Sequence, residues 1–359
     1  MRNLLRIDFF KLGLNQPTVD TRFRLMYNSF FHALEELGCC VTYCESKPNK
    51  DANVLVVPLG DGQDKSSALA MGVFGGPIIL YSSPAAEWFR RGFLNRWRDR
   101  ILFAYGFDVS EFSASMYARL GIPYYHLPFA STPSVMRPLG LQKMYDVAFV
   151  GSAGSGTGRH SYIGPLMRAI RSRKVLLIGP GWEAYGFPPQ FIAWGDLLNI
   201  VYNVTHICIN ISNDEEKIGP DRRLDANNRL FDLAMAGCFQ ISNAPQVVRC
   251  YFDETEVVAV DPPDEWVAKI MYYLDHPSET EVFCVAARSR ALAEHTWQHR
   301  AKQFLKMIQN HLPAWQESRT KTSQWVKIAR QCDTILSPYG VHKAISKLQR
   351  KLKRRLCRS

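Results

Sequence analysis

Short apolar runs of strand length recur along the first 130 residues, separated by polar segments that contain Gly and Pro. Two of the intervening segments place apolar residues at helical spacing, and they predict helices over Thr18 to Leu37 and Ser110 to Leu120. A regular alternation of strands and helices over this length predicts a parallel, doubly wound sheet. The strands are expected at Leu4 to Phe10, Cys40 to Cys44, Asn53 to Pro58, Pro77 to Ser82, Ile101 to Tyr105 and Tyr124 to Leu127.

A second alternating unit begins at Tyr145 and continues to about Asp275. The segment before it, Phe129 to Lys143, contains two Pro, a Gly and several Ser and Thr residues, and we interpret it as a linker between domains. Strands of the second unit are expected near Val147, Val175, Ile207, Phe239 and Val257, and two helices are expected afterwards, over Cys284 to Leu312 and Trp315 to Leu336. The pattern therefore predicts an α/β protein with domains at residues 1–135 and 144–312, a further helix within 313–342 and a tail at 343–359.

The composition agrees with two folded domains. The chain has 359 residues, of which 47% are hydrophobic and 21% charged, so each domain can bury a core of its own. Arg6 and Asp8 interrupt the apolar run at the N-terminus, which is too short for the core of a signal peptide. No apolar stretch approaches the roughly 20 residues that span a bilayer, and we expect a cytoplasmic protein.

Nine cysteines, an odd number that lie mostly in strand-like runs, favour reduced thiols in this compartment. Cys39, Cys40 and Cys44 lie close together, but no matching His or Cys pair completes a zinc site. His295 and His299 are four apart in a predicted helix, which is the spacing of metal ligands. Because no third ligand accompanies them, we interpret both as structural and predict no metal.

Two glycosylation sequons, Asn203-Val204-Thr205 and Asn210-Ile211-Ser212, lie in or beside a predicted buried strand. A glycan there would disrupt the sheet, so we interpret both sequons as chance matches.

Most of the net charge of +11 belongs to the segment Lys343 to Ser359, which carries eight basic residues and no acidic one. Its apolar residues follow helical spacing and form one stripe: Ile345, Leu348, Leu352 and Leu356. Such a helix lies on anionic lipid surfaces, whereas a tail without that function stays solvated. Aromatic residues are not interleaved with the charges, and we predict no nucleic-acid partner.

A glycine-rich loop, Gly151 to His160, follows the first strand of the second unit and reads G-S-A-G-S-G-T-G-R-H. Its glycines let the backbone approach a phosphate closely. The loop is not a P-loop, because no Lys-Ser/Thr pair follows Gly156, and Arg159 stands where a dinucleotide fingerprint needs its third Gly. Two interpretations remain: a cationic donor loop that includes Gly151, Ser152, Gly154, Gly156 and Arg159, or a turn whose Arg is solvated.

The segment Asn228 to Phe239, N-R-L-F-D-L-A-M-A-G-C-F, predicts a helix that follows a strand and a polar loop. Its N-terminus should lie at the carboxyl edge of the sheet and present unpaired N–H groups to an anion such as a nucleotide diphosphate. Arg229 and Asp232 are three apart, so they share one face of the first turn. They would serve a phosphate and ribose hydroxyls, or they form an ordinary surface ion pair.

Two further residues are candidates at strand ends. Gly181 and Trp182 follow the second strand of this unit, where the indole either stacks on a base or sugar or packs against the sheet. His126 ends the last strand of the first unit and is either an acceptor-side residue or a structural histidine.

Five segments in register resemble one family: Tyr145 to Ser152, Lys174 to Trp182, Asn228 to Phe239, Tyr272 to Pro277 and Glu294 to Ala301. Together they resemble the CgeB-like glycosyltransferases, a branch of the retaining GT-B enzymes. The similarity covers roughly Met144 to Ile308 and extends only loosely to the N-terminal half. The family usually has Glu where this chain has Asp232, whose side chain is one methylene shorter.

This resemblance implies a GT-B fold, in which two doubly wound Rossmann-like domains face a cleft and C-terminal helices cross back onto the first domain. It implies transfer of a hexosyl or related group from a nucleotide sugar to a glycan or lipid-linked acceptor, with retention, as in polysaccharide biosynthesis. The leaving phosphate would deprotonate the acceptor hydroxyl while Arg159 and Arg229 stabilise the developing charge. Donor contacts are then expected from Gly151, Ser152, Gly154, Gly156, Gly181, Trp182, Asn228 and Asp232.

No Asp-x-Asp motif occurs in the chain, and we predict an enzyme that needs no metal and no cofactor beyond its donor. Two alternatives stay open: a nucleotide-sugar epimerase of GT-B fold, and a non-catalytic protein that binds nucleotides or glycans. The tail would bring the enzyme to the cytoplasmic face of a membrane if its helix binds anionic lipid.

Overall fold

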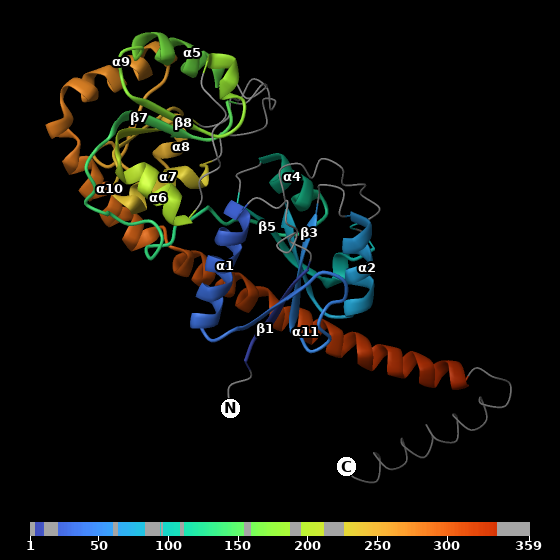
Figure 1. The fold of residues 1–359 in the computed structure, drawn as a ribbon. Helices are drawn as coiled ribbons and strands as arrows, with labels where there is room; N and C mark the ends of the chain where they lie inside the picture. Colours follow the sequence, from blue (N-terminus) through green and yellow to red (C-terminus); the bar gives the residue numbers. More distant parts are fainter. Residues whose placement is uncertain are drawn as a thin grey trace. The chain divides into compact units, whose positions relative to one another are not determined.

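A computed structural model describes residues 4–10, 21–59, 64–82, 94, 96–107, 111–153, 159–186, 195–211 and 226–335. The chain divides into two compact units, Met1–Met307 and Ile308–Ser359. The first unit contains two separate parallel sheets with their helices (Figure 1). The basic tail, Lys343 to Ser359, lies outside the described residues, and so do Gly154 and Gly156.

The first sheet has six strands in the order β2-β1-β3-β4-β5-β6, and all of its pairings are parallel. Every residue of β3 and β5 is buried, as expected for parallel strands that are covered on both faces. All six strands confirm the sequence prediction to within a few residues. Their bounds are β1 Arg6–Phe10, β2 Cys40–Cys44, β3 Val54–Leu59, β4 Ile78–Ser82, β5 Ile101–Gly106 and β6 Tyr124–His126.

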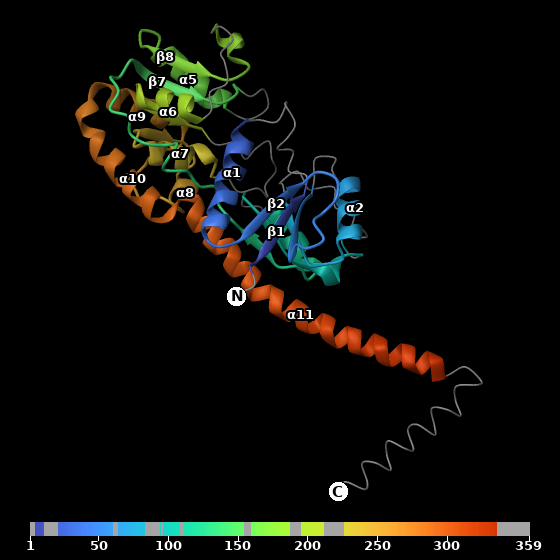
Figure 2. The ribbon, with the colours of Figure 1, turned by 60° about the horizontal axis from the view of Figure 1, so that its bottom comes forward.

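Among the described residues, this sheet is accompanied by the helices α1 Thr21–Glu36, α2 Asp64–Phe74 and α4 Glu111–Arg119 and by the 3-10 turn η2 Arg98–Arg100. Figures 1 and 2 both show α1 and α2 on opposite sides of the sheet. On the side of α2 and α4, Met71, Phe74 and Tyr117 join the buried core of the strands. The sequence pattern did not predict the helix α2.

The second sheet has five parallel strands in the order β11-β10-β9-β7-β8. Its strands and helices alternate along the chain, as predicted. The strands are β7 Tyr145–Val150, β8 Val175–Ile178, β9 Thr205–Asn210, β10 Gln240–Ser242 and β11 Val258–Ala259. The helices are α5 His160–Ala169, η3 Trp182–Tyr185, α6 Gly195–Asn203, α7 Asn228–Ala236, α8 Pro245–Val248 and α9 Pro263–Asp275.

Two hydrophobic cores cover the two faces of this sheet. Residues of α5 and α9 pack with Phe149 and Trp182 in one core, and residues of α6, α7 and α8 pack with Val150 and Ile178 in the other. Consecutive residues of β7 therefore point to opposite faces. The carboxyl end of β7 can thus be reached from both helical layers.

The C-terminal helices differ from the prediction. A short 3-10 turn, η5 Pro277–Glu279, leads into α10, Glu281–Glu294, and then α11 runs from Trp297 to Ile335 as one helix of 39 residues with Pro313 inside it. The predicted break at Pro313 is therefore wrong, and the chain breaks at His295 and Thr296 instead.

A contact with the linker explains where the break falls. The Ser131 N–H donates to the His295 carbonyl at 3.0 Å, and Ser131 forms a parallel bridge with Thr296. At His295 the backbone has φ of −123° and ψ of 38°, which lies outside the helical region, so the helix is interrupted where the chain pairs with Ser131. Because α10 ends before His295 and α11 begins after it, His295 and His299 do not share a helical face as the sequence had suggested.

The beginning of α11 packs on the first sheet. The Phe304 ring lies 5.5 Å from Phe30 and 5.1 Å from Tyr105, measured between ring centroids, and Trp297 lies 5.7 Å from Phe107. Contact with the first domain thus begins earlier in the chain than the predicted crossing helix at 313–342. Among the described residues, no helix is long and apolar enough to cross a membrane.

The linker between the sheets is held by two buried asparagines of α6. The Asn199 side chain accepts from the Arg137 N–H at 3.1 Å and donates to the Arg137 carbonyl at 3.0 Å, and Asn203 accepts from the Leu139 N–H at 2.8 Å. Asn203 is 6% exposed and Asn210, in the second sequon, is 1% exposed. Neither asparagine has room for a glycan.

Candidate functional site

The loops that follow β7 and β8 are joined backbone to backbone. The Gly151 N–H donates to the Ile178 carbonyl at 2.7 Å, and the Ala153 N–H donates to the Pro180 carbonyl at 2.9 Å. At Gly179, whose φ is 129°, an added Cβ would lie 2.4 Å from the Gly151 carbonyl oxygen. Glycine is therefore needed at this position, and the two strand ends form one closely packed base for the site.

Trp182 lies in the core beneath the sheet edge and bonds to this base. Its side chain is 0% exposed, its Nε1–H donates to the Gly151 carbonyl at 2.9 Å, and its ring meets Phe149 edge to face at 5.6 Å. Stacking of this indole on a donor base or sugar is therefore ruled out by its burial, and the packing interpretation is correct. Gly181, with φ of 88°, precedes η3 and allows the turn that buries the ring.

The helix that carries Arg229 begins as the sequence predicted. Asn227 caps α7, since its side-chain oxygen accepts from the Leu230 N–H at 3.2 Å, and Gly237 ends the helix with φ of 66°. One N–H of the first turn is thus bonded within the protein, which leaves a smaller share of the helix N-terminus for an anion than the sequence suggested.

Arg229 joins the ends of two neighbouring strands. Its Nε donates to the Val150 carbonyl of β7 at 2.9 Å, and its Nη1 donates to the Asn210 side-chain oxygen of β9 at 3.1 Å. The guanidinium carbon also lies 4.5 Å from the centroid of the Phe149 ring. These contacts place a cation at the carboxyl edge of the sheet, where open α/β sheets bind their ligands.

Arg159 approaches the same aromatic ring. Its Nη1 donates to the Ser152 carbonyl at 2.8 Å and to the Ser152 hydroxyl at 3.2 Å, and its guanidinium carbon lies 5.7 Å from the Phe149 centroid. The structure therefore brings together the two arginines that the sequence proposed for catalysis. Two cations around one ring make this edge of the sheet attractive to an anion.

Asp232 points away from these strand ends, toward the linker. One carboxylate oxygen accepts from the Ser131 hydroxyl at 2.7 Å, and the other accepts from the Asn228 amide at 3.0 Å. The side chain is 8% exposed and lines a cavity of about 50 Å³ together with Asn228 and with Met26 and Ser29 of α1.

Asn210 is a site residue that the sequence reading missed. Its oxygen accepts from Arg229, its amide donates to the Ser242 hydroxyl at 3.2 Å, and Ser242 in turn donates to the Asn243 carbonyl at 2.8 Å. The Asn243 N–H closes the network by donating to the Asn210 carbonyl at 3.1 Å. A buried polar network of this kind fixes the rotamers of its members and so orients the Arg229 guanidinium. The available signal was an Asn at the end of one strand and Ser-Asn at the end of the next strand along the chain.

His126 lies at the end of β6, apart from the arginine pair. Its Nε2 is 3.2 Å from the Phe107 carbonyl, an acceptor, so Nε2 carries the proton. Burial lowers the pKa of this imidazole, which favours the neutral form. The acceptor-side role of His126 stays a prediction.

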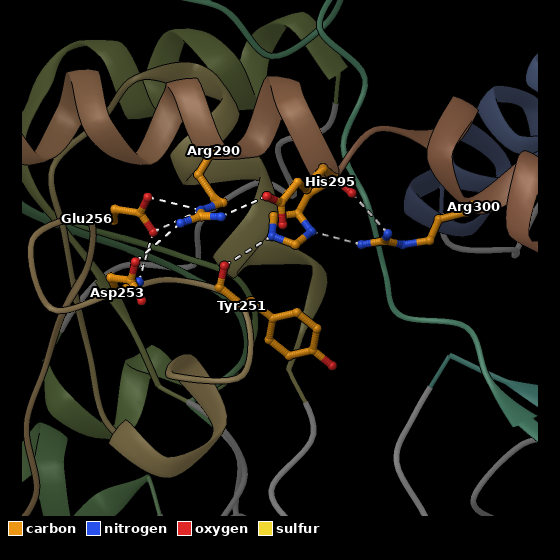
Figure 3. A network of polar contacts seen from close by, with 7 residues as sticks. Tyr251, Asp253, Glu256, Arg290, His295 and Arg300 are labelled. Carbon is orange, nitrogen blue, oxygen red and sulfur yellow. Dashed lines mark hydrogen bonds and ion pairs between the residues drawn. The ribbon is translucent and has the colours of Figure 1, made fainter.

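A buried network packs against α7, where the His295 ring lies 5.2 Å from the ring of Phe231 between centroids. Figure 3 shows the polar contacts of this network. His295 is 6% exposed, its Nε2 lies 3.1 Å from the Tyr251 carbonyl, and its Nδ1 lies 3.1 Å from Nη2 of Arg300. A carbonyl only accepts and a guanidinium only donates, so His295 is the neutral tautomer with its proton on Nε2. Burial is the main reason that the pKa of His295 falls to about 4.

Arg300 connects this network to the linker. Its Nε donates to the Pro128 carbonyl at 2.9 Å and its Nη2 donates to the Phe129 carbonyl at 3.1 Å. The residue is 3% exposed, and burial lowers the pKa of its guanidinium to about 10. Its guanidinium carbon lies 5.9 Å from the ring of Phe231, the neighbour of Asp232 in α7.

Arg290 forms the outer part of the network in Figure 3. It pairs with Glu256 at 3.0 Å, with Glu294 at 2.7 Å and with Asp253 at 3.2 Å, each measured from a guanidinium nitrogen to a carboxylate oxygen. These pairs fix the loop before β11 to α10, and the loop in turn provides the Tyr251 carbonyl for His295.

Over the part of the chain that the structure describes, no group of three or more His, Cys, Asp or Glu residues is arranged to hold a metal ion.

Known proteins resemble this chain in sequence over one segment and in fold over most of its length. Residues 159–306 match the model of a family described as "Glycosyl transferase-like". A search of curated proteins found no match. Among solved structures, a glycosyltransferase from Rickettsia africae superposes with a TM-score of 0.62 at 11% identity, over 86% of this chain and 99% of that one.

Two further solved structures show the same similarity. A sucrose-phosphate synthase from Thermosynechococcus elongatus superposes with a TM-score of 0.60 at 12% identity, over 86% of this chain and 99% of that one. The Anabaena protein HepE, in complex with UDP-glucose, has a TM-score of 0.59 at 10% identity, over 85% of this chain and 99% of that one. These similarities confirm the predicted GT-B fold of two Rossmann-like domains, and with the family match they support glycosyl transfer as the general activity.

Proposed function

We propose that this protein transfers a hexosyl or related group from a nucleotide-sugar donor to a glycan or lipid-linked acceptor, with retention and without a metal ion. The observation that carries the proposal is the pair of arginines, Arg159 and Arg229, gathered around Phe149 at the carboxyl end of β7. Solved structures of similar fold hold UDP or UDP-glucose, which supports a nucleotide sugar as the donor.

In this proposal the donor diphosphate lies between the two arginines and the glycine-rich loop. Gly151 leaves room for the Arg229 guanidinium beside the loop, because a Cβ at that position would lie 2.7 Å from Nη2 of Arg229. Ser152, Gly154, Gly156 and Gly181 complete the loops around the phosphates. Asn228 and Asp232 contact the ribose, and Trp182 acts only by holding the Gly151 carbonyl from below.

The reaction needs no nucleophile from the protein. The bond between the anomeric carbon and the leaving phosphate oxygen breaks, and the acceptor oxygen bonds to the same face of that carbon. The acceptor proton passes to the leaving phosphate. Arg159 and Arg229 stabilise the negative charge that develops on this phosphate, which is the role that a divalent cation fills in metal-dependent transferases.

The first experiment is a thermal-shift screen with UDP, GDP, ADP and the corresponding monophosphates, because a ligand that binds only the native state raises the melting temperature. We expect a shift with at least one diphosphate and a smaller shift for Arg229→Ala. The absence of any shift at millimolar nucleotide would refute the donor site.

The second experiment measures turnover of the nucleotide sugar that binds, with and without saccharide and polyprenyl-phosphate-linked acceptors. A transferase consumes donor faster when an acceptor is present and forms a product with retained configuration at the anomeric carbon. An epimerase releases a free epimer without any acceptor, and a binding protein shows no turnover. We expect transfer to continue in EDTA, and a loss of activity that Mg²⁺ or Mn²⁺ restores would contradict the proposed independence of metal.

A further inference from the structure

A groove of about 560 Å³ lies between α1 and the linker, next to the Asp232 cavity. The two hollows share four wall residues: Ser29, Thr132, Val135 and Trp297. The volume falls within the range of roughly 300 to 1,000 Å³ that is usual for small-molecule sites. The groove is thus large enough for a ligand and adjoins the carboxylate that we assign to the donor ribose.

The walls of this groove carry amide and hydroxyl groups. Asn28, Ser29 and Glu36 come from α1, Thr132 comes from the linker and Gln298 comes from the start of α11. Several of these groups already bond to one another: Thr132 donates to the Ser29 hydroxyl at 2.8 Å, and Gln298 donates to the Glu36 carboxylate at 3.2 Å. Groups that donate and accept in this way match the hydroxyls of a sugar, which also do both.

The charge of the groove excludes the donor itself. The lining residues include the Glu36 carboxylate and His32, whose Nε2 lies 3.2 Å from that carboxylate, but no Lys or Arg, in contrast to the arginine pair at β7. A phosphate here would face the Glu36 carboxylate, and the one imidazole beside it already bonds to Glu36. The chemistry of the walls therefore selects an uncharged polyhydroxylated ligand over a nucleotide.

We propose that this groove binds the neutral saccharide part of the acceptor, an inference that rests on the proposed transferase function. A sugar held between α1 and the linker would lie beside Asp232. The groove carries a carboxylate and the phosphate site carries two arginines, so the two sites select different ligands. The ordered hydrogen bonds between Thr132 and Ser29 and between Gln298 and Glu36 hold the two walls together before the ligand arrives, which reduces the entropy lost on binding.

Saturation-transfer NMR tests this proposal with glucose, galactose, mannose, N-acetylglucosamine and maltose as probes. Asn28→Trp fills the groove from α1, and Ser134→Trp fills it from the linker, where Ser134 is also an exposed wall residue. Glu35→Trp is the matched control, because Glu35 is exposed on the same helix but does not line the groove. We expect signals from at least one sugar in the wild type and in the control, and loss of these signals in both groove-filling variants.

Measurements with UDP distinguish a failure of this proposal from a failure of the donor assignment. Saturating UDP should leave the sugar signals intact, and the UDP-induced thermal shift should be equal in all four proteins. If no sugar binds, if the filled variants bind as the wild type does, or if UDP displaces the sugar, the groove is not the acceptor site. If sugars bind in the groove while no nucleotide shifts the melting temperature, the groove stands and the donor assignment fails.

Discussion

Acid should destabilise the fold through His295. The imidazole is neutral in the folded state, since Nε2 donates to the Tyr251 carbonyl and Nδ1 accepts from Arg300. A second proton would have to go on Nδ1, where it would face the guanidinium of Arg300, with Arg290 also nearby; the Tyr251 carbonyl and Glu294 favour the protonated form, but burial outweighs them. Protonation therefore breaks a buried hydrogen bond and places two cations side by side.

The size of this effect follows from the difference between the two states. The pKa is 6.5 in the unfolded chain and about 4 in the folded protein, so the unfolded chain binds more protons between these values. Stability is then lost as the pH falls from 6.5 toward 4, by about 2 kcal/mol at pH 5 and by about 3 kcal/mol once both states are protonated. Above pH 7 the titration of His295 no longer changes the stability, because the imidazole is neutral in both states.

The assay is urea unfolding of the wild type and His295→Gln at pH 7.5, 6 and 5, followed by tryptophan fluorescence. The Gln amide can still donate to the Tyr251 carbonyl but does not titrate. Burial also lowers the pKa values of His126 and His299, and these residues titrate in both proteins, so the comparison isolates His295. The wild type should lose about 2 kcal/mol more than the variant between pH 7.5 and pH 5. Parallel pH dependences would show that His295 is not the titrating group.

Four further changes, at Asn210, at Asp232 and in the tail, test the site and the membrane role. Asn210→Ala removes a bond to the Arg229 guanidinium and should weaken binding of the preferred nucleoside diphosphate by roughly 1.5 to 3 kcal/mol in calorimetry; unchanged affinity would show that Asn210 does not orient Arg229. Asp232→Glu should preserve or raise transfer, because the cavity of about 50 Å³ has room for one methylene, whereas Asp232→Asn should weaken nucleotide binding; two variants that behave as the wild type would exclude a ribose contact. Deleting 343–359 should abolish salt-sensitive binding to anionic vesicles and spare transfer to a soluble acceptor, and equal vesicle binding by both proteins would refute the membrane role.

The strands could be predicted because burial on both faces of a sheet requires a run of apolar residues, which is visible in the local sequence. A parallel strand covered on both faces is apolar almost throughout, and β3 and β5 show this pattern in the sequence. The sequence signal for helix α2 is weaker. Its buried residues Ala70, Met71 and Phe74 follow helical spacing, but Leu69 and Val73 are apolar and exposed, so the two faces of the helix do not differ clearly.

The break between α10 and α11 could not be predicted from local signals. Pro313 is the strongest breaker in the region, and a sequence reading places the break there. The chain breaks at His295 because a residue of the linker, Ser131, pairs with the backbone there. Because Ser131 and His295 are far apart in the chain, the residues next to His295 carry no signal that predicts this contact.

The site shows the same division between local and distant information. Arg159 and Arg229 belong to local motifs, and the sequence identified them, whereas Asn210 gains its role only because it accepts from Arg229. The linker residue Ser131 connects two of the distant contacts, since its hydroxyl donates to Asp232 and its N–H donates to the His295 carbonyl. A shift of this segment would therefore move both the carboxylate and the helix break. For that reason, His295→Gln should be measured for nucleotide affinity as well as for stability. A change in affinity would locate the coupling in the linker, because His295 itself is buried and bonds with Ser131 of the linker and with Arg300.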